Sequence, residues 1–371
     1  MRVAIMCNTK SSEYPNRPEL IEDFIAKGDV VFFAAIDDGV IHPYFSEGKA
    51  SYLPVLASRN NTNPIVEIKS LINVKKQVKK YRIDGAVIYG IKNHPAMAIG
   101  CRMGGVKQIV CVVNGRGNLF TAKGVKGKIL RMISYPMLKI AYKCSQTVCF
   151  QNEDDAELFI QKHLVNRRKV SYTDGSGVNT DLFPFYEMPK QNDFLYLARI
   201  TPSKGVKEYI EAAEILKKKY PDTRFHVVGP VDNMVEESCM SIIDKAASKG
   251  IILYHGRTDD VKGWLKSTRY FVYPSYYPEG VPRCVLQAMS CGRPIITCNS
   301  PGCKKTVIEN ENGYLVEPKN SEDVAERMEL LICDKIQAEK MGRASRNLAE
   351  TVFNVRIINK IIISLVHKEE I

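Results

Sequence analysis

The chain has 371 residues, and its 53 Lys and Arg exceed its 41 Asp and Glu by 12, which gives a pI near 9.0. The length suits two domains of about 100 to 200 residues each, and the positive charge favours polyanions or an anionic lipid surface as partners. No apolar run approaches the roughly 18 residues of a membrane-spanning helix, and residues 1–10 lack the cationic start and apolar core of a signal peptide, so we expect a cytoplasmic protein that is at most peripheral to a membrane.

Short apolar runs alternate with helical patterns along the first half of the chain. We expect strands at residues 2–7, 30–35, 84–89, 108–113, 148–152 and 169–173. This alternation is typical of an α/β fold with a parallel sheet. No Gly-x-Gly-x-x-Gly follows the first of these strands, where the fingerprint of a dinucleotide-dependent oxidoreductase would have to be, so the sequence argues against that class.

Residues 123–143 predict a helix with a kink at Pro136 and with basic and aromatic side chains on one face. These side chains are Lys128, Arg131, Tyr135, Lys139, Tyr142 and Lys143, whereas Ile129, Met132, Ile133 and Ile140 occupy other sides. The pattern fits a helix that lies on an anionic membrane surface. It fits an ordinary solvated surface helix equally well, so both interpretations stay open.

The segment 184–192 is the best candidate for a linker, because it contains two prolines and shows no periodicity. It separates an expected N-terminal domain, residues 1–183, from a C-terminal domain, residues 193–350. In the second domain we expect strands at residues 194–200, 225–229, 251–256, 270–273 and 295–297. The last segment, residues 351–371, carries apolar side chains on one helical face and must pack on another part of the protein.

The most informative block is residues 273–307, where a loop carrying Glu279 joins a buried strand to a helix that begins at Pro282. Proline suits the first position of a helix because its φ is fixed, and Gly292 and Pro294 end this helix. Glu279 then lies at the carboxyl end of a strand, where open α/β folds bind ligands. The unpaired N–H groups of the helix start would stabilise a diphosphate there.

Two cations follow the strand at residues 194–200. Arg199 and Lys204 precede a helical pattern that begins after Gly205. A guanidinium can fork onto phosphate oxygens, and an ammonium adds a point charge. The alternative is a solvated pair at a helix start, but the position upstream of Glu279 favours phosphate binding.

The cysteines, histidines and aspartates form no metal-binding pattern. The 11 Cys include no Cys-x2-Cys pair, the six His are scattered, and no Asp-x-Asp is present. We therefore expect buried reduced thiols, structural histidines, no metal and no cofactor.

The block around Glu279 resembles the family 4 retaining glycosyltransferases of the GT-B fold. Their signature is a Glu, seven intervening residues and a second Glu, followed by a small-residue helix; here the pair is Glu279 and Gln287. The resemblance implies two Rossmann-like domains with parallel sheets that face each other across a cleft, and metal-independent chemistry. Gln287 departs from the pattern, although an amide can still donate to and accept from a ribose diol, and Lys305 stands where relatives usually carry Glu.

The same resemblance implies roles for the matched residues. Glu279 would hold the hydroxyls of the transferred sugar, and Arg199 and Lys204 would bind the donor diphosphate as the other members of the catalytic set. The implied donor-binding set is Arg199, Lys204, Gly229, Arg257, Glu279, Gly280, Val281, Arg283, Val285 and Gln287, with Arg257 at the base. On the acceptor side, residues similar to those of one bacterial branch of the family are Asn16, Arg17, Asn114 and Arg116.

That branch elongates lipid-linked oligosaccharides and includes the bacillosamine-diphosphoundecaprenol N-acetylgalactosaminyltransferases. The resemblance therefore implies transfer of a hexose or N-acetylhexosamine from a UDP-sugar, as co-substrate, to a polyprenyl-diphosphate-linked saccharide in the assembly of bacterial surface polysaccharide or glycan. It also implies a peripheral position on the inner face of the cell membrane, and a last segment, residues 351–371, that crosses back to the first domain.

Two other functions remain open. Gln287 and Lys305 suggest a non-catalytic nucleotide-sugar-binding protein. A sugar-nucleotide epimerase would share the architecture, but its acid/base carboxylates and histidines cannot be placed. Nucleic-acid binding rests on charge alone, without stacking aromatics in a basic groove, and we expect no such partner.

Overall fold

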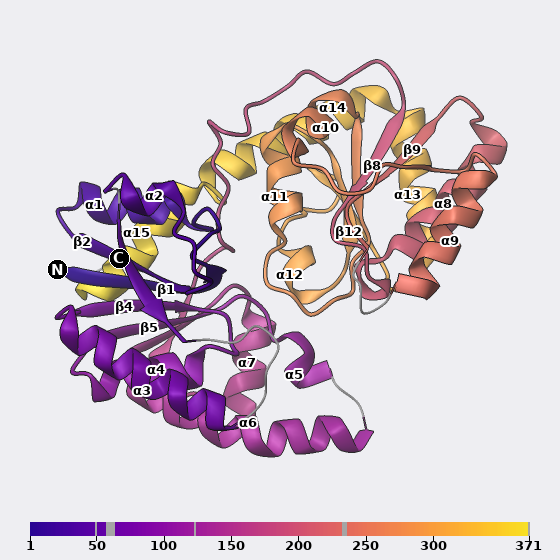
Figure 1. Cartoon of the computed structure of the whole chain (residues 1–371). Coiled ribbons are helices and arrows are strands. Elements are labelled where there is room, and N and C mark those ends of the chain that lie inside the picture. Colours follow the sequence, from indigo (N-terminus) through magenta and orange to yellow (C-terminus); the bar gives the residue numbers. More distant parts are fainter. Residues whose placement is uncertain (49, 57–63, 122–123, 232–235, 370–371) are drawn as a thin grey trace. The chain divides into compact units, whose positions relative to one another are not determined.

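The computed structural model describes the chain except residues 49, 57–63, 122–123, 232–235 and 370–371 (Figure 1). The chain divides into two compact units, Met1–Ser176 with Val355–Ile371, and Gly177–Asn354. Each unit contains one parallel sheet covered by helices, as in doubly wound α/β domains. In the described part of the chain, no helix combines the length and the hydropathy that crossing a membrane requires.

The sheet of the first unit has the strand order β3-β2-β1-β4-β5-β6-β7. Its strands are β1 (Arg2–Lys10), β2 (Val30–Ile36), β3 (Ser51–Val55), β4 (Gly85–Tyr89), β5 (Gln108–Val113), β6 (Thr147–Phe150) and β7 (Val170–Tyr172). The order reverses between β1 and β4, which makes this the switch point of the sheet. The sequence did not predict β3, because Pro54 lies within it; the strand forms at the edge of the sheet, where proline is tolerated.

The helices of the first unit are α1 (Pro18–Ala26), α2 (Pro43–Ser46), α3 (Pro64–Lys80), α4 (His94–Met103), α5 (Gly117–Thr121), α6 (Gly124–Cys144), α7 (Glu153–Gln161), the 3-10 turn η1 (Arg167–Lys169) and α15 (Val355–His367). On one face of the sheet, Leu20 and Phe24 of α1 share a buried cluster with Ile362 and Val366 of α15. The last helix of the chain is therefore part of the core of the first unit.

The opposite face is covered by α3, α4 and α6 (Figure 1), which place Val74, Met97 and Leu138 in one buried cluster. The structure corrects the expected faces of α6. Tyr142 is buried against His94, with ring centroids 5.6 Å apart, and does not share an outer face with the lysines. Beside exposed lysines, the outer side of α6 carries exposed apolar side chains, namely Val125, Ile129, Met132, Ile133 and Ile140.

Two further expectations concern the same helix, namely the kink at Pro136 and the start at residue 123. The helix continues through Pro136 as a single element, from Gly124 to Cys144. Lys123, the first residue of the expected membrane helix, lies outside the described residues.

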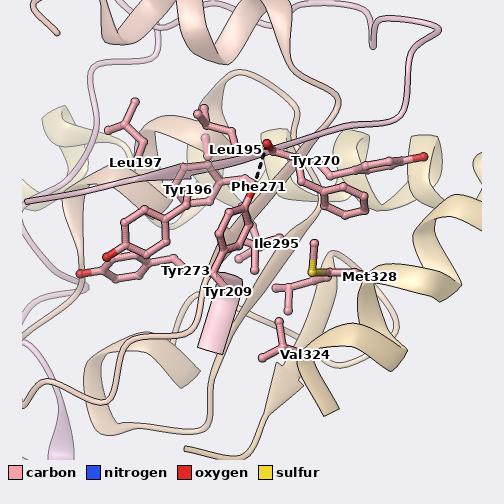
Figure 2. Close-up of a cluster of buried hydrophobic side chains, with 14 of the residues drawn as sticks. Leu195, Tyr196, Leu197, Tyr209, Tyr270, Phe271, Tyr273, Ile295, Val324 and Met328 are labelled. Carbon is pink, nitrogen blue, oxygen red and sulfur yellow. Dashed lines mark hydrogen bonds between the residues drawn. The ribbon is translucent and has the colours of Figure 1, made fainter. Parts of the chain in front are cut away.

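The sheet of the second unit has the order β10-β9-β8-β11-β12-β13. Its strands are β8 (Asp193–Leu197), β9 (Arg224–Val228), β10 (Leu253–Tyr254), β11 (Tyr270–Tyr273), β12 (Ile295–Cys298) and β13 (Gly313–Val316). Its helices are η2 (Pro202–Lys204), α8 (Val206–Lys219), α9 (Glu236–Ser248), α10 (Val261–Ser267), α11 (Arg283–Ser290), α12 (Pro301–Lys304), α13 (Ser321–Cys333) and α14 (Lys335–Thr351). Figure 2 shows part of the core, a buried cluster to which neighbouring strands contribute Leu195, Phe271 and Ile295 and α13 contributes Val324 and Met328.

Residues 184–192, the expected linker, lie within the second unit. The reason is electrostatic. Arg293 is fully buried and donates hydrogen bonds to Tyr186 O and Thr268 O, while Arg269 donates to Pro189 O at 2.6 Å. Each buried guanidinium needs carbonyl acceptors, and the carbonyls of this segment supply them, so the segment is held against the unit.

His94 gives a pH-dependent prediction for the first unit. The neutral ring donates from Nε2 to Ile88 O (3.2 Å) and accepts at Nδ1 from Tyr142 OH (3.1 Å), and burial lowers its pKa from 6.5 to about 4. Protonation therefore favours the unfolded state, so the stabilising contribution is complete above pH ~6.5 and falls as the pH drops toward 4. In His94→Phe, we expect the free energy of unfolding, measured by urea titration, to depend less on pH between 7 and 4.5, by up to about 1.4 kcal/mol per pH unit. An unchanged pH dependence would contradict this role.

Candidate active site

The candidate site lies at the carboxyl edge of the second sheet, where η2 follows β8 and the Glu279 loop follows β11. The two segments are joined by hydrogen bonds: Tyr276 N donates to Ser203 O (3.0 Å), and Tyr276 OH donates to Pro202 O (2.9 Å). Because the parallel strands β8 and β11 are neighbours, the segments that leave them are brought side by side. This arrangement places Lys204 against Glu279.

One oxygen of the Glu279 carboxylate receives three donors. Oε1 lies 2.7 Å from Lys204 Nζ, 2.8 Å from Tyr273 OH and 3.1 Å from Ser275 Oγ. The Lys204 and Glu279 side chains are only 13% and 18% exposed, so their ion pair is much less screened by solvent than a surface pair. In the part of the chain that the structure describes, no donor reaches the second oxygen, Oε2, which leaves it available to a ligand.

Aromatic rings surround the lysine. Lys204 Nζ lies 5.5 Å from the ring centroid of Tyr273 and 4.9 Å from that of Tyr277, distances typical of cation–π contacts. Burial, reinforced by the negative charge of Glu279, raises the pKa of Tyr273 well above 10. Tyr273 therefore stays protonated and acts as a hydrogen-bond donor to Glu279.

Close backbone contacts fix the site, and glycines make them feasible. A Cβ on Gly205, whose φ is +78°, would lie 2.1 Å from Pro274 O, and a Cβ on Gly302 would lie 1.8 Å from Gly280 O. No side chain fits at either position. Gly205 thus lets the Lys204 turn press against the end of β11, and Gly302 lets α12 press against the Glu279 loop.

The other residues of the expected donor set lie along the same edge. Arg199 follows β8. It lies close enough to Tyr277 to act on its pKa: burial raises the pKa of the Tyr277 hydroxyl, and the positive charge of Arg199 lowers it. Gly229, after β9, donates to Gly256 O at 2.7 Å. Arg257, after β10, is 76% exposed and pairs with Asp259 at 3.4 Å.

The start of α11 contributes the remaining expected donor residues. Pro282 is the N-cap, and Arg283 is the first helical residue, one later than expected. Gly280, Val281 and Val285 are buried, Arg283 is exposed and Gln287 is half-buried. Arg283 and Gln287 are four residues apart and therefore lie on the same face of α11.

The acceptor-side residues lie at the carboxyl edge of the first sheet. The Arg17 guanidinium stacks over the ring of Tyr89, the last residue of β4, at 4.4 Å, and Asn16 beside it is exposed. Arg116 forms an ion pair with Asp155 at 2.7 Å.

Asn114, just after β5, accepts from Gln151 Nε2 at 3.4 Å, and this amide also donates to Ser176 Oγ. The structure thus brings Asn114 next to Gln151, while Arg17 lies at the switch point between β1 and β4.

The sequence predicted Glu279 and Lys204 but not the side chains that hold them. Tyr273, Ser275 and Tyr277 were missed, because in a strand end and a loop they resemble ordinary core or turn residues. The clustering of tyrosines at positions 273, 276 and 277 was the available signal. Among the described residues, no group of three or more His, Cys, Asp or Glu is arranged to hold a metal ion, and metal independence stays a prediction.

Comparison with known proteins gives the family of the second unit. Residues 180–348 match the model described as Glycosyl transferases group 1. The chain is 27% identical over 352 residues, 90% of either chain, to N,N'-diacetylbacillosaminyl-diphospho-undecaprenol alpha-1,3-N-acetylgalactosaminyltransferase of Campylobacter jejuni. It is 28% identical over 337 residues to UDP-Gal:alpha-D-GlcNAc-diphosphoundecaprenol alpha-1,3-galactosyltransferase of Escherichia coli, covering 86% of this chain and 84% of the relative.

Solved structures share the fold at low sequence identity. Anabaena Alr3699/HepE in complex with UDP has a TM-score of 0.77 at 16% identity and covers 99% of this chain and 100% of its own. Sucrose-phosphate synthase from Thermosynechococcus elongatus has a TM-score of 0.79 at 17% identity, and the match covers 99% of this chain and 98% of the synthase chain. These matches confirm the GT-B fold and the resemblance to glycosyltransferases that the Glu279 block predicts, and residues 180–348 match the group 1 glycosyl transferase model.

Proposed function

We propose that the protein transfers a hexose or N-acetylhexosamine, with retention, from a UDP-sugar to a polyprenyl-diphosphate-linked saccharide during assembly of a bacterial surface glycan. The observation that carries the proposal is the Glu279 carboxylate, anchored through one oxygen and open at the other. The names of the two bacterial relatives support the acceptor class, since both act on diphosphoundecaprenol-linked sugars. The UDP complex of HepE supports the donor class.

Lys204 would change partners when the donor binds. In the structure its ammonium is paired with Glu279 Oε1. A diphosphate carries more charge than a carboxylate and would attract Lys204 and the nearby Arg199. Glu279 would still be held by the hydroxyls of Tyr273 and Ser275, so its open oxygen could accept a hydrogen bond from a sugar hydroxyl.

The proposed reaction needs no covalent nucleophile. The bond between C1 of the sugar and the diphosphate oxygen breaks, and the acceptor hydroxyl oxygen bonds to C1 on the same face. The acceptor proton passes to the leaving diphosphate, so UDP departs and the configuration is retained. Lys204, Arg199 and the backbone N–H groups at the start of α11 would stabilise the charge that develops on UDP, which is preorganised electrostatic catalysis without a metal.

The proposed partners of the first unit are the lipid-linked acceptor and the membrane that holds it. Asn16, Arg17, Asn114 and Arg116 are the proposed acceptor contacts. The exposed apolar side of α6, which also carries Lys128, Lys139 and Lys143, is proposed to contact the inner face of the cell membrane.

A non-catalytic sugar-nucleotide-binding protein is the second candidate. Gln287 is half-buried on α11 in place of the family's second Glu. A neutral amide binds a ribose diol less strongly than a carboxylate does. This candidate binds UDP and leaves the sugar donor intact with every lipid-linked acceptor, so turnover separates the two functions.

The first prediction concerns the nucleotide. In thermal unfolding with EDTA present, UDP at a hundred times its Kd should raise the melting temperature by about 5 °C or more, since a ligand of the folded state adds about 2.7 kcal/mol there. GDP, ADP and TDP at the same concentration should give smaller shifts. A cooperative transition that no nucleotide moves would refute the donor site.

The second prediction concerns Glu279. Glu279→Gln keeps the shape of the side chain but removes its charge, and we expect kcat to fall by about 100-fold or more, with a small change in melting temperature. The matched control is Glu211→Gln, which breaks an exposed pair with Lys207 on α8 and should leave kcat unchanged. Wild-type turnover by Glu279→Gln would exclude its proposed role.

The third prediction concerns Gln287. A carboxylate makes hydrogen bonds stronger by about 1 kcal/mol than a neutral amide does, so Gln287→Glu should bind UDP about fivefold more tightly in calorimetric titration. Equal or weaker binding would show that Gln287 does not contact the ribose.

A further inference from the structure

The exposed side of α3 combines isoleucines with lysines. Ile65, Ile68 and Ile72 are 62%, 56% and 57% exposed, and their spacing of three and four residues puts them in one row along the helix. The exposed lysines on the same side are Lys69, Lys75, Lys76, Lys79 and Lys80. Large apolar side chains that gather in one exposed row mark an interaction surface.

The opposite side of α3 is fixed by tight packing on α4. Val74 and Val78 are buried, and a Cβ on Gly100 of α4 would lie 2.8 Å from Leu71 O. At the next turn, a Cβ on Gly104 would lie 2.2 Å from a Val78 methyl group. Because α3 is seated this closely, it cannot rotate to bury its isoleucines.

The exposed sides of α3 and α6 point in the same direction. Both helices bury their other side in the cluster on one face of the first sheet, and α4 packs beside each of them. Their exposed sides therefore face away from the same sheet face (Figure 1). On α6 the exposed apolar side chains are Val125 (73%), Ile129 (48%), Met132 (71%), Ile133 (55%) and Ile140 (47%).

We infer that α3 and α6 together form one membrane-docking surface, which we call the α3/α6 surface, and that its occupant is a bilayer containing anionic lipids. The inference rests on the proposed membrane partner and adds to it a second helix that the sequence did not indicate. Isoleucine and methionine side chains would enter the boundary of headgroups and acyl chains, while the lysines reach the lipid phosphates.

Charge complementarity selects this occupant. α6 contains no Asp or Glu, and the single acid of α3, Glu67, is half-buried near Lys92, with burial raising its pKa. A nucleic acid would attract the lysines but offers nothing to exposed isoleucines. An anionic bilayer satisfies both kinds of side chain over two helices at once.

Docking through this surface would place the acceptor side near the lipid. Asn114 and Arg116 follow β5, and the chain continues from them through α5 into α6. The segment that carries these proposed acceptor contacts is therefore tethered directly to a docking helix.

The test is binding to lipid vesicles in a flotation assay. The full chain should float with vesicles of phosphatidylcholine mixed with phosphatidylglycerol and remain unbound with phosphatidylcholine alone. In the triple variant Ile65→Ser, Ile68→Ser and Ile72→Ser, we expect partitioning to fall by at least about tenfold, because apolar side chains lose their insertion. The set Lys75→Gln, Lys76→Gln and Lys79→Gln should weaken binding and reduce its dependence on salt.

Controls separate this inference from the proposed function. Ile336→Ser removes a 71% exposed isoleucine on α14 of the second unit and should float like the wild type. The UDP-induced thermal shift should be the same in the isoleucine triple variant and the wild type, so loss of that shift in the wild type would count against the donor site alone.

Two outcomes would overturn the inference. The first is wild-type flotation by both the isoleucine and the lysine variants. The second is a wild-type protein that does not bind anionic vesicles but forms a dimer, while the isoleucine variant is monomeric. That result would assign the α3/α6 surface to contact with a second copy of the chain.

Discussion

The candidate site depends on one shared carboxylate oxygen. Glu279 Oε1 accepts hydrogen bonds from Lys204 of η2, from Tyr273 at the end of β11 and from Ser275 in the loop that follows β11. Each donor belongs to a different part of the edge, so the position of the loop is determined by the register of β8 and β11. The tight backbone contacts at Gly205 and Gly302 hold these parts close enough for the three hydrogen bonds to form.

Much of the fold could be predicted from sequence because it depends on local pattern. The strand at β11, the loop with Glu279 and the helix α11 follow one another within a short block, and strand ends in a parallel sheet lie at one edge. Lys204 could be placed at the same edge for the same reason. Tyr273 could not, because a tyrosine that ends a buried strand has the same sequence pattern whether its hydroxyl donates to a backbone carbonyl or to a carboxylate such as that of Glu279.

The prediction that was wrong concerns which side of α6 faces the core, and the exposed row on α3 was missed for a similar reason. Periodicity showed that α6 has distinct sides, but only the packing of Tyr142 against His94 reveals which side is buried. The isoleucine row of α3 resembles a core-facing row in the sequence, and the structure places it outside because Val74 and Val78 already occupy the core. The hydrogen bonds that Arg293 and Arg269 donate to carbonyls of residues 184–192 could not be predicted from local pattern, because these partners are far away in sequence.

The position of α15 has a consequence for the order in which the protein is made. The buried cluster of the first unit includes Ile362, Ile363 and Val366, and Val366 lies close to Gly85 of β4. During synthesis, the first unit cannot complete this core until its last helix has left the ribosome, although its strands emerge first. The second unit, Gly177–Asn354, is continuous in sequence and can fold as soon as it has been synthesised. The first unit begins to be translated earlier but completes its folding later.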